Sequence, residues 1–284
     1  MVENTNPLNK YFRVPSIYVR LPSGGGYAPN IIEATQTGEL GVMPMTAKDE
    51  IRFKTPDALL NGQGVVDVIQ SCVPSVKDAW GIKSYDLDTL LIAVRIATYG
   101  ETMDISYSVP GTALKGAHTV NLPSLLEQLG QTKIEKEIVL KDGLKINTKP
   151  LEYRDITKTS IETFNQQKMF ASVSDSQAAP EVKSERFNEA FQALSELTQT
   201  LLRKNIESIT TPEGATVSDP AQIDEFIQNA NAVVINEITE KLTVLRQQGS
   251  VKPIKLKASE EEIKAGAPVT YEVPVTFDTA NFFV

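Results

Sequence analysis

The stretch YDLDTLLIAVRIATYGETMDISYSV, residues 85–109, changes its hydrophobic period halfway along and so decides the fold class. Its first part places apolar side chains on one face of a helix, which we expect to end at Gly100. After Gly100, apolar and polar residues alternate, which is typical of a half-buried β-strand. The helical stripe consists of Leu87, Leu90, Leu91 and Val94, and the strand face of Met103, Ile105, Tyr107 and Val109. A helix followed directly by a strand predicts an α+β protein.

Two segments downstream predict a small antiparallel sheet. AHTVNL, residues 117–122, follows a glycine-containing turn and has strand character. KEIVLKDGLKINTK, residues 136–149, has the pattern of a β-hairpin, and Asp142-Gly143 suits a two-residue type I′ turn. The middle of the chain is therefore expected to carry β-hairpins.

Short helices are expected before the central stretch. Thr46 can cap a helix with Asp49 three residues later, close to a capping box. Thr55 and Pro56 predict the start of another helix by the same logic. A third helical pattern, VVDVIQSCV at residues 65–73, places Cys72 on its apolar face, so we interpret Cys72 as a buried small hydrophobe.

Asp86, Asp88 and Arg95 could be drawn as a catalytic set, because all three lie on the central helix. Acidic residues near a helix N-terminus also favour the helix dipole, and Arg95 lies about two turns further on. We therefore expect the two acids to cap the helix.

The second half of the chain is expected to be mainly helical. Residues 156–171 have helical character, and the polar segment 172–185 with Pro180 is the best internal linker. Amphipathic helices over residues 187–202 and 220–249 are expected to form a hairpin. Residues 251–257 and 269–277 return to strand character.

Residues 1–45 are irregular, rich in Pro and Gly, and predict an extended N-terminal arm. The arm is followed by an α+β domain over residues 46–155 and a mainly helical part with C-terminal strands over residues 156–284. Removing residues 1–40 is accordingly expected to leave a folded protein. Gly24–Gly26 lack the Lys-Ser or Lys-Thr and the helix that a phosphate-binding loop requires, so we interpret them as a turn.

The composition of the chain argues against several classes of function. The chain has 284 residues, a net charge of −8 and no long basic cluster, which argues against binding to nucleic acid. No apolar run approaches the length that spans a bilayer, and the N-terminus lacks the features of a signal peptide, so we expect cytosolic synthesis without membrane insertion. One cysteine excludes an internal disulfide, and one histidine argues against a Ser-His-Asp enzyme.

The order of these features resembles the baseplate hub proteins of contractile-tailed T-even-like bacteriophages. The segments that carry the resemblance are MPMTAKDEIRFKTPDALLNGQGVVDVIQSCV, DLDTLLIAVRIATYGE and the terminal FDTANFF. The resemblance implies a non-enzymatic component of the central tail baseplate, made in the host cytoplasm and acting through contacts with other baseplate proteins or copies of itself. An assembly factor that leaves the finished virion is the alternative.

The chain departs from that family at two segments where relatives often carry Cys-x-x-Cys pairs of zinc-ribbon type. A structural zinc needs four Cys or His ligands, and this chain holds Cys72 and His118 only. We therefore expect no metal and no other cofactor, with the ribbon-like β segments held by strand pairing and burial.

Exposed aromatic residues are the candidates for the interface with a partner. In the arm they are Tyr11, Phe12, Tyr18 and Tyr27, and at the C-terminus Phe282 and Phe283. The two terminal phenylalanines are expected to dock inside the protein, with insertion into a partner subunit as the alternative. A double Phe282→Ala, Phe283→Ala variant that melts lower in isolation would favour internal docking.

Overall fold

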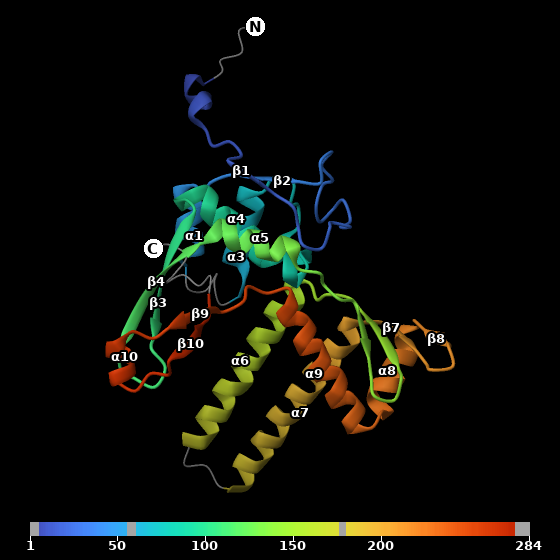
Figure 1. The fold of residues 1–284 in the computed structure, drawn as a ribbon. Helices are drawn as coiled ribbons and strands as arrows, with labels where there is room; N and C mark the ends of the chain where they lie inside the picture. Colours follow the sequence, from blue (N-terminus) through green and yellow to red (C-terminus); the bar gives the residue numbers. More distant parts are fainter. Residues whose placement is uncertain (1–5, 56–60, 176–179, 276–284) are drawn as a thin grey trace.

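The computed structural model describes residues 6–55, 61–175 and 180–275 and has a mixed α+β fold (Figure 1). The central stretch folds as predicted: helix α4, Ser84–Tyr99, has Gly100 as its C-cap, and strand β3, Thr102–Ser108, follows directly. Buried side chains gather in three hydrophobic clusters, and α4 contributes to both the first and the second. The predicted α+β class is confirmed.

The first cluster surrounds α4. Helix α1, Ala47–Phe53, begins at Thr46, which forms the predicted capping box with Asp49. Helix α3, Gln63–Cys72, buries Cys72 completely, which confirms its interpretation as a small core residue. The other elements are the 3₁₀ helix η2, Ala79–Gly81, and two paired antiparallel strands, β1, Ile17–Val19, and β2, Leu40–Val42. The helix expected at Thr55-Pro56 falls mostly on residues 56–60, outside the described residues.

Residues 17–42 belong to this first cluster, which differs from the free arm expected over residues 1–45. Their buried side chains are Val19, Leu21, Ile32, Leu40 and Val42. Ile32 also forms an isolated antiparallel bridge with Val76. Of the described arm, residues 6–16 belong to none of the three clusters, and the short helix Pro7–Tyr11 projects from the body (Figure 1). Strands β1 and β2 are too short to show a hydrophobic period in the sequence. They form because they pair with each other although they lie apart in the chain.

The second cluster joins the middle of the chain to its C-terminal strands. β3 pairs with β4, Lys115–Asn121, and helix α5, Leu122–Gln131, follows with Asn121 as its N-cap. β9, Ile254–Lys257, pairs with β10, Thr270–Val273, and the short helix α10, Glu260–Lys264, connects them. The predicted strand face is confirmed, because Met103, Ile105 and Val109 are buried in this cluster and Tyr107 packs against it; Tyr271, Val273 and Val275 are buried in the same cluster. This cluster contains residues from both the expected α+β domain, 46–155, and the expected helical part, 156–284. The division of the chain into three parts stays a prediction.

The third cluster lies under a four-stranded antiparallel sheet of order β5-β6-β7-β8. Ile146 of β6 is fully buried between its partners, Ile138 of β5 and Ile209 of β7. Helices α8 and α9 contribute Ile223, Ile227, Ile238 and Leu242 to the same cluster. The bounds are β5, Glu137–Val139; β6, Lys145–Thr148; β7, Ile206–Thr210; β8, Thr216–Val217; α8, Pro220–Asn229; and α9, Ala232–Gln248.

The predicted hairpin at residues 136–149 forms, but its turn is longer than the two-residue type I′ turn expected. Leu140 N–H donates to the Leu144 carbonyl at 2.8 Å, which leaves three residues in the loop. A type I′ turn needs positive φ at both central residues, and here Gly143 has φ +89° whereas Asp142 does not have a positive φ. Gly143 thus takes the left-handed position of a three-residue loop.

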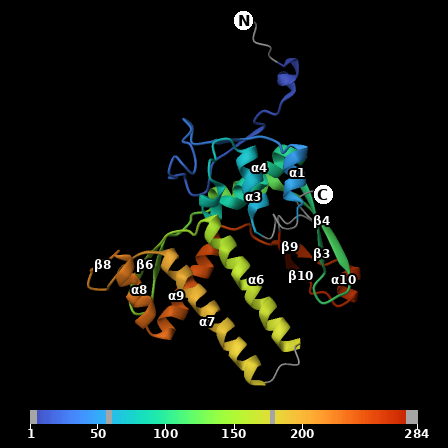
Figure 2. The same cartoon turned by 180° about the vertical axis from the view of Figure 1, so that it is seen from behind.

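Helices α6, Tyr153–Asp175, and α7, Pro180–Asn205, project from the body as a pair that lies side by side in both views (Figures 1 and 2). The helical hairpin therefore forms from these two helices, and the hairpin expected between residues 187–202 and 220–249 is wrong. Strands β7 and β8 follow α7, and the single helix expected over 220–249 is split into α8 and α9, with Asn231 capping α9. None of the helices in the described ranges is both long and apolar enough to cross a membrane.

Candidate protein interface

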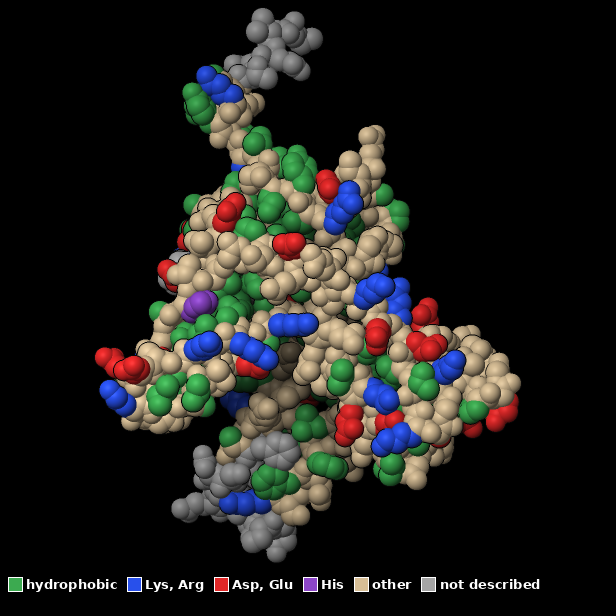
Figure 3. All heavy atoms as spheres, in the orientation of Figure 1, with side chains coloured by type: hydrophobic (Ala, Val, Ile, Leu, Met, Phe, Trp, Pro, Cys, Tyr) green, Lys and Arg blue, Asp and Glu red, His purple; other side chains and the backbone are tan. Residues whose placement is uncertain are grey.

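The projecting arm, residues 6–16, presents large apolar side chains to solvent. It begins with the 3₁₀ helix η1, Pro7–Tyr11, whose N-cap Asn6 accepts the Leu8 N–H at 3.0 Å. Tyr11 is 73% exposed, Phe12 61% and Val14 68%. Figure 3 shows hydrophobic and basic side chains on this projecting segment. The sequence between residues 6 and 32 contains no acidic side chain, so the arm is apolar and basic on an acidic protein.

Arg13 fixes the arm to the body. Its Nη1 donates to the Pro44 carbonyl at 2.9 Å and to Asp49 Oδ2 at 3.1 Å. Its Nη2 donates to the Ser71 carbonyl at 2.9 Å and to Ser71 Oγ at 2.8 Å. The planar guanidinium thus joins the start of α1 to the end of α3 and holds the arm at one point.

Asp49 is buried and depends on this arrangement. Burial alone would raise the pKa of Asp49, but hydrogen bonds from Thr46 and Ser71 and the charge of Arg13 hold the pKa below its ordinary value. The carboxylate therefore stabilises the fold at neutral pH, and that contribution is lost as the pH falls through the lowered pKa.

We expect Arg13→Ala to destabilise the protein by about 2 kcal/mol, because it removes charge-assisted hydrogen bonds and leaves Asp49 buried without its cation. Urea unfolding measures this change, and amide exchange at Ser16, which donates to Val42, reports release of the arm. Arg20→Ala is the matched control, because the Arg20–Glu39 pair is largely exposed and should contribute little. Equal effects of the two variants would contradict the anchoring role of Arg13.

The other two aromatic candidates of the arm region differ from each other. Tyr18 lies on β1 opposite Gly41 and is 63% exposed. Tyr27 lies apart from this group and packs against the first cluster. Its hydroxyl donates to Asp86 Oδ2 at 2.5 Å and accepts the Lys83 N–H at 3.0 Å. Tyr11, Phe12 and Tyr18 are therefore exposed, whereas Tyr27 is partly buried against the first cluster.

Asp86 does not cap α4 as predicted. The N-cap is Lys83, whose side chain makes no capping hydrogen bond, while the fully buried Asp86 accepts the Ser23 N–H at 2.9 Å together with the Tyr27 hydroxyl. Asp88 accepts the Val251 N–H at 3.4 Å. Both carboxyl groups therefore bind backbone N–H groups of loops that lie far away in the sequence. Burial raises the pKa of each carboxyl.

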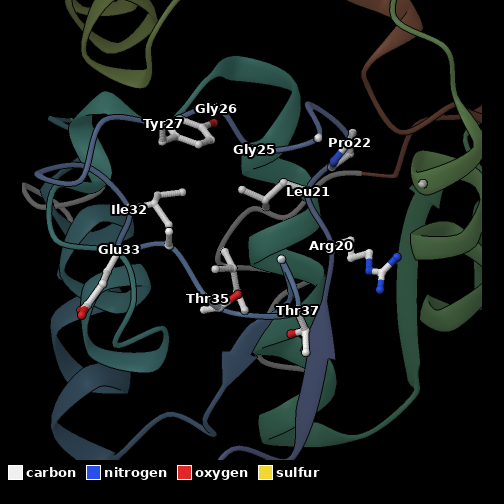
Figure 4. A pocket seen from close by; sticks show the side chains of 15 residues that line it. Arg20, Leu21, Pro22, Gly25, Gly26, Tyr27, Ile32, Glu33, Thr35 and Thr37 are labelled. Atoms are coloured by element: carbon white, nitrogen blue, oxygen red, sulfur yellow. The ribbon is translucent and has the colours of Figure 1, made fainter.

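A cavity of about 630 Å³ lies beside β1 (Figure 4). Leu21 and Ile32 point toward the same space from opposite walls, and Leu40 also lines it. The polar lining includes Arg20, Glu33, Thr35 and Thr37. Its size lies within the range of protein ligand pockets. This cavity could not be predicted from sequence, because its walls come together only through the pairing of β1 with β2.

Phe282 and Phe283 lie outside the described residues, so their interface role stays a prediction. The two residues considered as zinc ligands lie on different elements, Cys72 at the end of α3 and His118 on β4. Among the described residues, three or more His, Cys, Asp or Glu side chains never gather in a way that could hold a metal ion.

We expect elemental analysis of the purified protein to find no stoichiometric zinc, because four Cys or His ligands are not available in one chain. Dialysis against buffer without chelator should precede the measurement, so that loosely bound ions are removed. About one zinc per chain after dialysis would contradict the prediction.

A known family matches most of the chain. The family described as T4 bacteriophage base plate protein matches residues 19–270, which include the buried residues of the first and third clusters, most of those of the second, and the helical hairpin. Comparison with curated proteins found no match, and neither did comparison with solved structures. The match covers well over half of the chain, so this chain belongs to the T4 bacteriophage base plate protein family.

Proposed function

We propose that this protein is a structural subunit of the central hub region of the phage tail baseplate and that it acts through contacts with other baseplate proteins. The observation that carries the proposal is the projecting arm, on which Tyr11 and Phe12 are exposed although Arg13 is firmly anchored. Large apolar side chains held in solvent mark a contact surface, and aromatic residues are frequent hot spots of such surfaces.

The helical hairpin α6–α7 supplies a second surface suited to contacts. Phe164 is 54% exposed and Phe191 is 69% exposed, and both helices project from the body (Figure 2). A subunit that meets several neighbours needs more than one such surface. The buried acids also act structurally, because Asp49 accepts from Arg13 and Asp86 accepts from Ser23 and Tyr27. These features support a non-enzymatic role.

The test is a double variant, Tyr11→Ala with Phe12→Ala, produced in the host cytoplasm during infection. Both side chains are exposed, so the variant should melt like the parent, but its amount in purified baseplates should fall at least about tenfold. The matched control is Val233→Ala with Val244→Ala, because these α9 side chains are 70% and 58% exposed at a distance from the arm in sequence. Normal incorporation of the arm variant would refute the proposed role of the arm.

Protein analysis of purified virions separates a resident subunit from an assembly factor. A fixed number of copies in finished tails supports the structural role. Presence in baseplate intermediates combined with absence from virions would instead identify a factor that leaves after assembly.

A further inference from the structure

The two-stranded sheet of β3 and β4 has an uncovered edge. β4 pairs with β3 on one side, over seven residues and without a bulge, and the sheet contains no third strand in the described part of the chain. Strand β4 lies at the margin of the molecule in both cartoon views (Figures 1 and 2). Seven residues of strand span roughly 23 Å. An edge of this kind presents a row of unpaired backbone N–H and C=O groups, which can pair with another extended chain.

Hydrogen bonds just beyond the two ends of the ladder show which backbone groups of β4 point outward. Val109 N–H donates to the Leu114 carbonyl at 2.9 Å, and Leu122 N–H donates to the Glu101 carbonyl at 2.9 Å. Hydrogen-bonded and non-hydrogen-bonded pairs alternate along an antiparallel ladder. Every second residue counted from Leu114 therefore bonds to β3, and the residues between them direct their N–H and C=O groups away from the sheet.

The outward groups belong to Lys115, Ala117 and Thr119. Their backbone N–H groups donate to no acceptor within the described residues. The Thr119 side chain is used within the sheet, because its hydroxyl donates to Asp104 Oδ1 on β3. The backbone of the same residue is left for a partner.

The other sheet edges of the described residues are short or protected. Helix α9 covers β5, because Lys241 Nζ donates to the Val139 carbonyl at 2.7 Å. Strands β1, β2 and β8 have three residues or fewer. Pro253 and Pro274 bound β9 and β10 at the same end of their ladder, and β3 carries the charge of Asp104. Proline, charge, cover and short length all discourage strand addition, so β4 is the edge best suited to it.

The side chains beside this edge indicate what kind of chain fits it. Leu114, one residue before β4, is 42% exposed, and His118 is half-buried, whereas Val120 is buried in the second cluster. These residues share one face, because side chains alternate along a strand. A strand added to β4 therefore places every second side chain beside Leu114 and His118, where apolar residues fit best.

We propose that an extended segment of another baseplate protein, apolar at alternate positions, adds to β4 as the third strand of this sheet. Its backbone pairs with the outward N–H and C=O groups of Lys115, Ala117 and Thr119. A second copy of this chain is the poorer occupant, because each copy carries a net charge of −8. The inference rests on the proposed function, which takes other baseplate proteins as partners, and it names the surface and the mode of one contact.

Amide hydrogen exchange of the unaltered protein tests the added strand, read by mass spectrometry with residue resolution. In the isolated protein the N–H groups of Ala117 and Thr119 should exchange fast, and those of Gly116 and His118, which bond to β3, should exchange slowly. In purified baseplates the exchange of Ala117 and Thr119 should be at least about tenfold slower. Slow exchange already in the isolated protein would mean that the chain covers its own edge. Fast exchange in baseplates would mean that no strand is added, and either result overturns the proposal.

A proline at the edge tests whether the pairing is needed for incorporation. Ala117→Pro removes an outward N–H and leaves the ladder bonds to β3 in place, which edge strands tolerate. Its amount in purified baseplates should fall at least about tenfold. Ser106→Pro is the matched control, because Ser106 is the partner of Ala117 on β3 and its N–H points to the opposite edge. Calorimetry first checks that both variants unfold cooperatively. Normal incorporation of Ala117→Pro, or equal loss of both variants, contradicts the proposal.

Photochemical cross-linking identifies the occupant. A variant with benzoylphenylalanine in place of Ala117 is assembled into baseplates, which are purified and irradiated. Mass spectrometry should find the product joined to a different baseplate protein. A product that joins two copies of this chain, or joins position 117 to residues 276–284 of the same chain, would show that the proposed occupant is wrong.

These outcomes can be separated from those that test the proposed function. If Ala117→Pro enters baseplates normally while the Tyr11→Ala, Phe12→Ala variant is excluded, the strand addition falls and the proposed function stands. If Ala117→Pro is excluded while the arm variant enters normally, the edge is the contact surface and the proposed role of the arm falls. If the unaltered protein is absent from both baseplates and virions, the proposed function itself is refuted.

Discussion

Removing residues 1–40 is expected to abolish the cooperative unfolding transition. The deleted segment includes β1 and four buried apolar side chains of the first cluster, Val19, Leu21, Ile32 and Leu40. Full burial of one such side chain contributes about 1.5–3 kcal/mol, so together they contribute on the order of 6–12 kcal/mol as an upper estimate. The net stability of a whole domain is about 5–15 kcal/mol. The first cluster should not survive this loss, in contrast to the expectation from sequence.

The matched truncation removes residues 1–12 and keeps Arg13 with its contacts to Ser71 and Asp49. Its described part, residues 6–12, contributes nothing to the three clusters, so its melting temperature should equal that of the parent. Differential scanning calorimetry of both truncations makes the comparison. A cooperative transition in the protein that lacks residues 1–40 would show that the segment adds little to the core and that it behaves as a free arm.

The parts of the fold that depend on local chemistry were predictable from sequence. The capping box of Thr46 and Asp49 involves residues three apart, and Gly100 ends α4 through its own backbone conformation. Apolar and polar residues alternate along β3 and β10 because one face of each strand is buried. In each case the signal and its structural cause lie within a few residues of each other.

The errors came from contacts between residues far apart in the chain. β7, Ile206–Thr210, follows α7 directly and forms because β6 offers a pairing edge, although more than fifty residues separate the two strands. The arm was misjudged for the same reason, since β1 and β2 have three residues each and are stable only when paired and covered by α4. A hydrophobic period cannot reveal pairing of this kind.

The candidate interface was predictable only in part. Exposure of Tyr11, Phe12 and Tyr18 follows from their position in a segment with Pro and Gly and without core periodicity. The roles of Arg13 and Asp86 were missed because their partners are between 31 and 63 residues away. The absence of acids from residue 6 to residue 32 was a visible signal, and it would have marked the arm as the basic element of the chain.

Asp86→Ala is expected to lower the free energy of unfolding by about 2–5 kcal/mol. The carboxylate is fully buried and accepts the Ser23 N–H and the Tyr27 hydroxyl, so its removal leaves two partly buried donors without an acceptor. Each such group costs about 1–3 kcal/mol. Tyr27→Phe removes one of the two hydrogen bonds together with its donor, so its effect should be about 1 kcal/mol. Asp104→Ala is the control on an exposed strand position and should change stability by less than about 0.5 kcal/mol.

The pH dependence of stability gives an independent test of the same site. Burial raises the pKa of Asp86 in the folded protein, with Lys83, Tyr27 and Tyr85 around it, so the folded state retains the proton at a pH where the unfolded chain has lost it. The stabilising contribution of that proton is therefore complete below the unfolded pKa of about 3.9 and is lost as the pH rises through the folded pKa. Asp86→Asn cannot titrate, so the stability of the parent relative to this variant should increase as the pH falls from 7 toward 4. Urea unfolding at several pH values measures the difference, and a difference that decreases toward acid would mean that hydrogen bonding to the ionised carboxylate outweighs its burial.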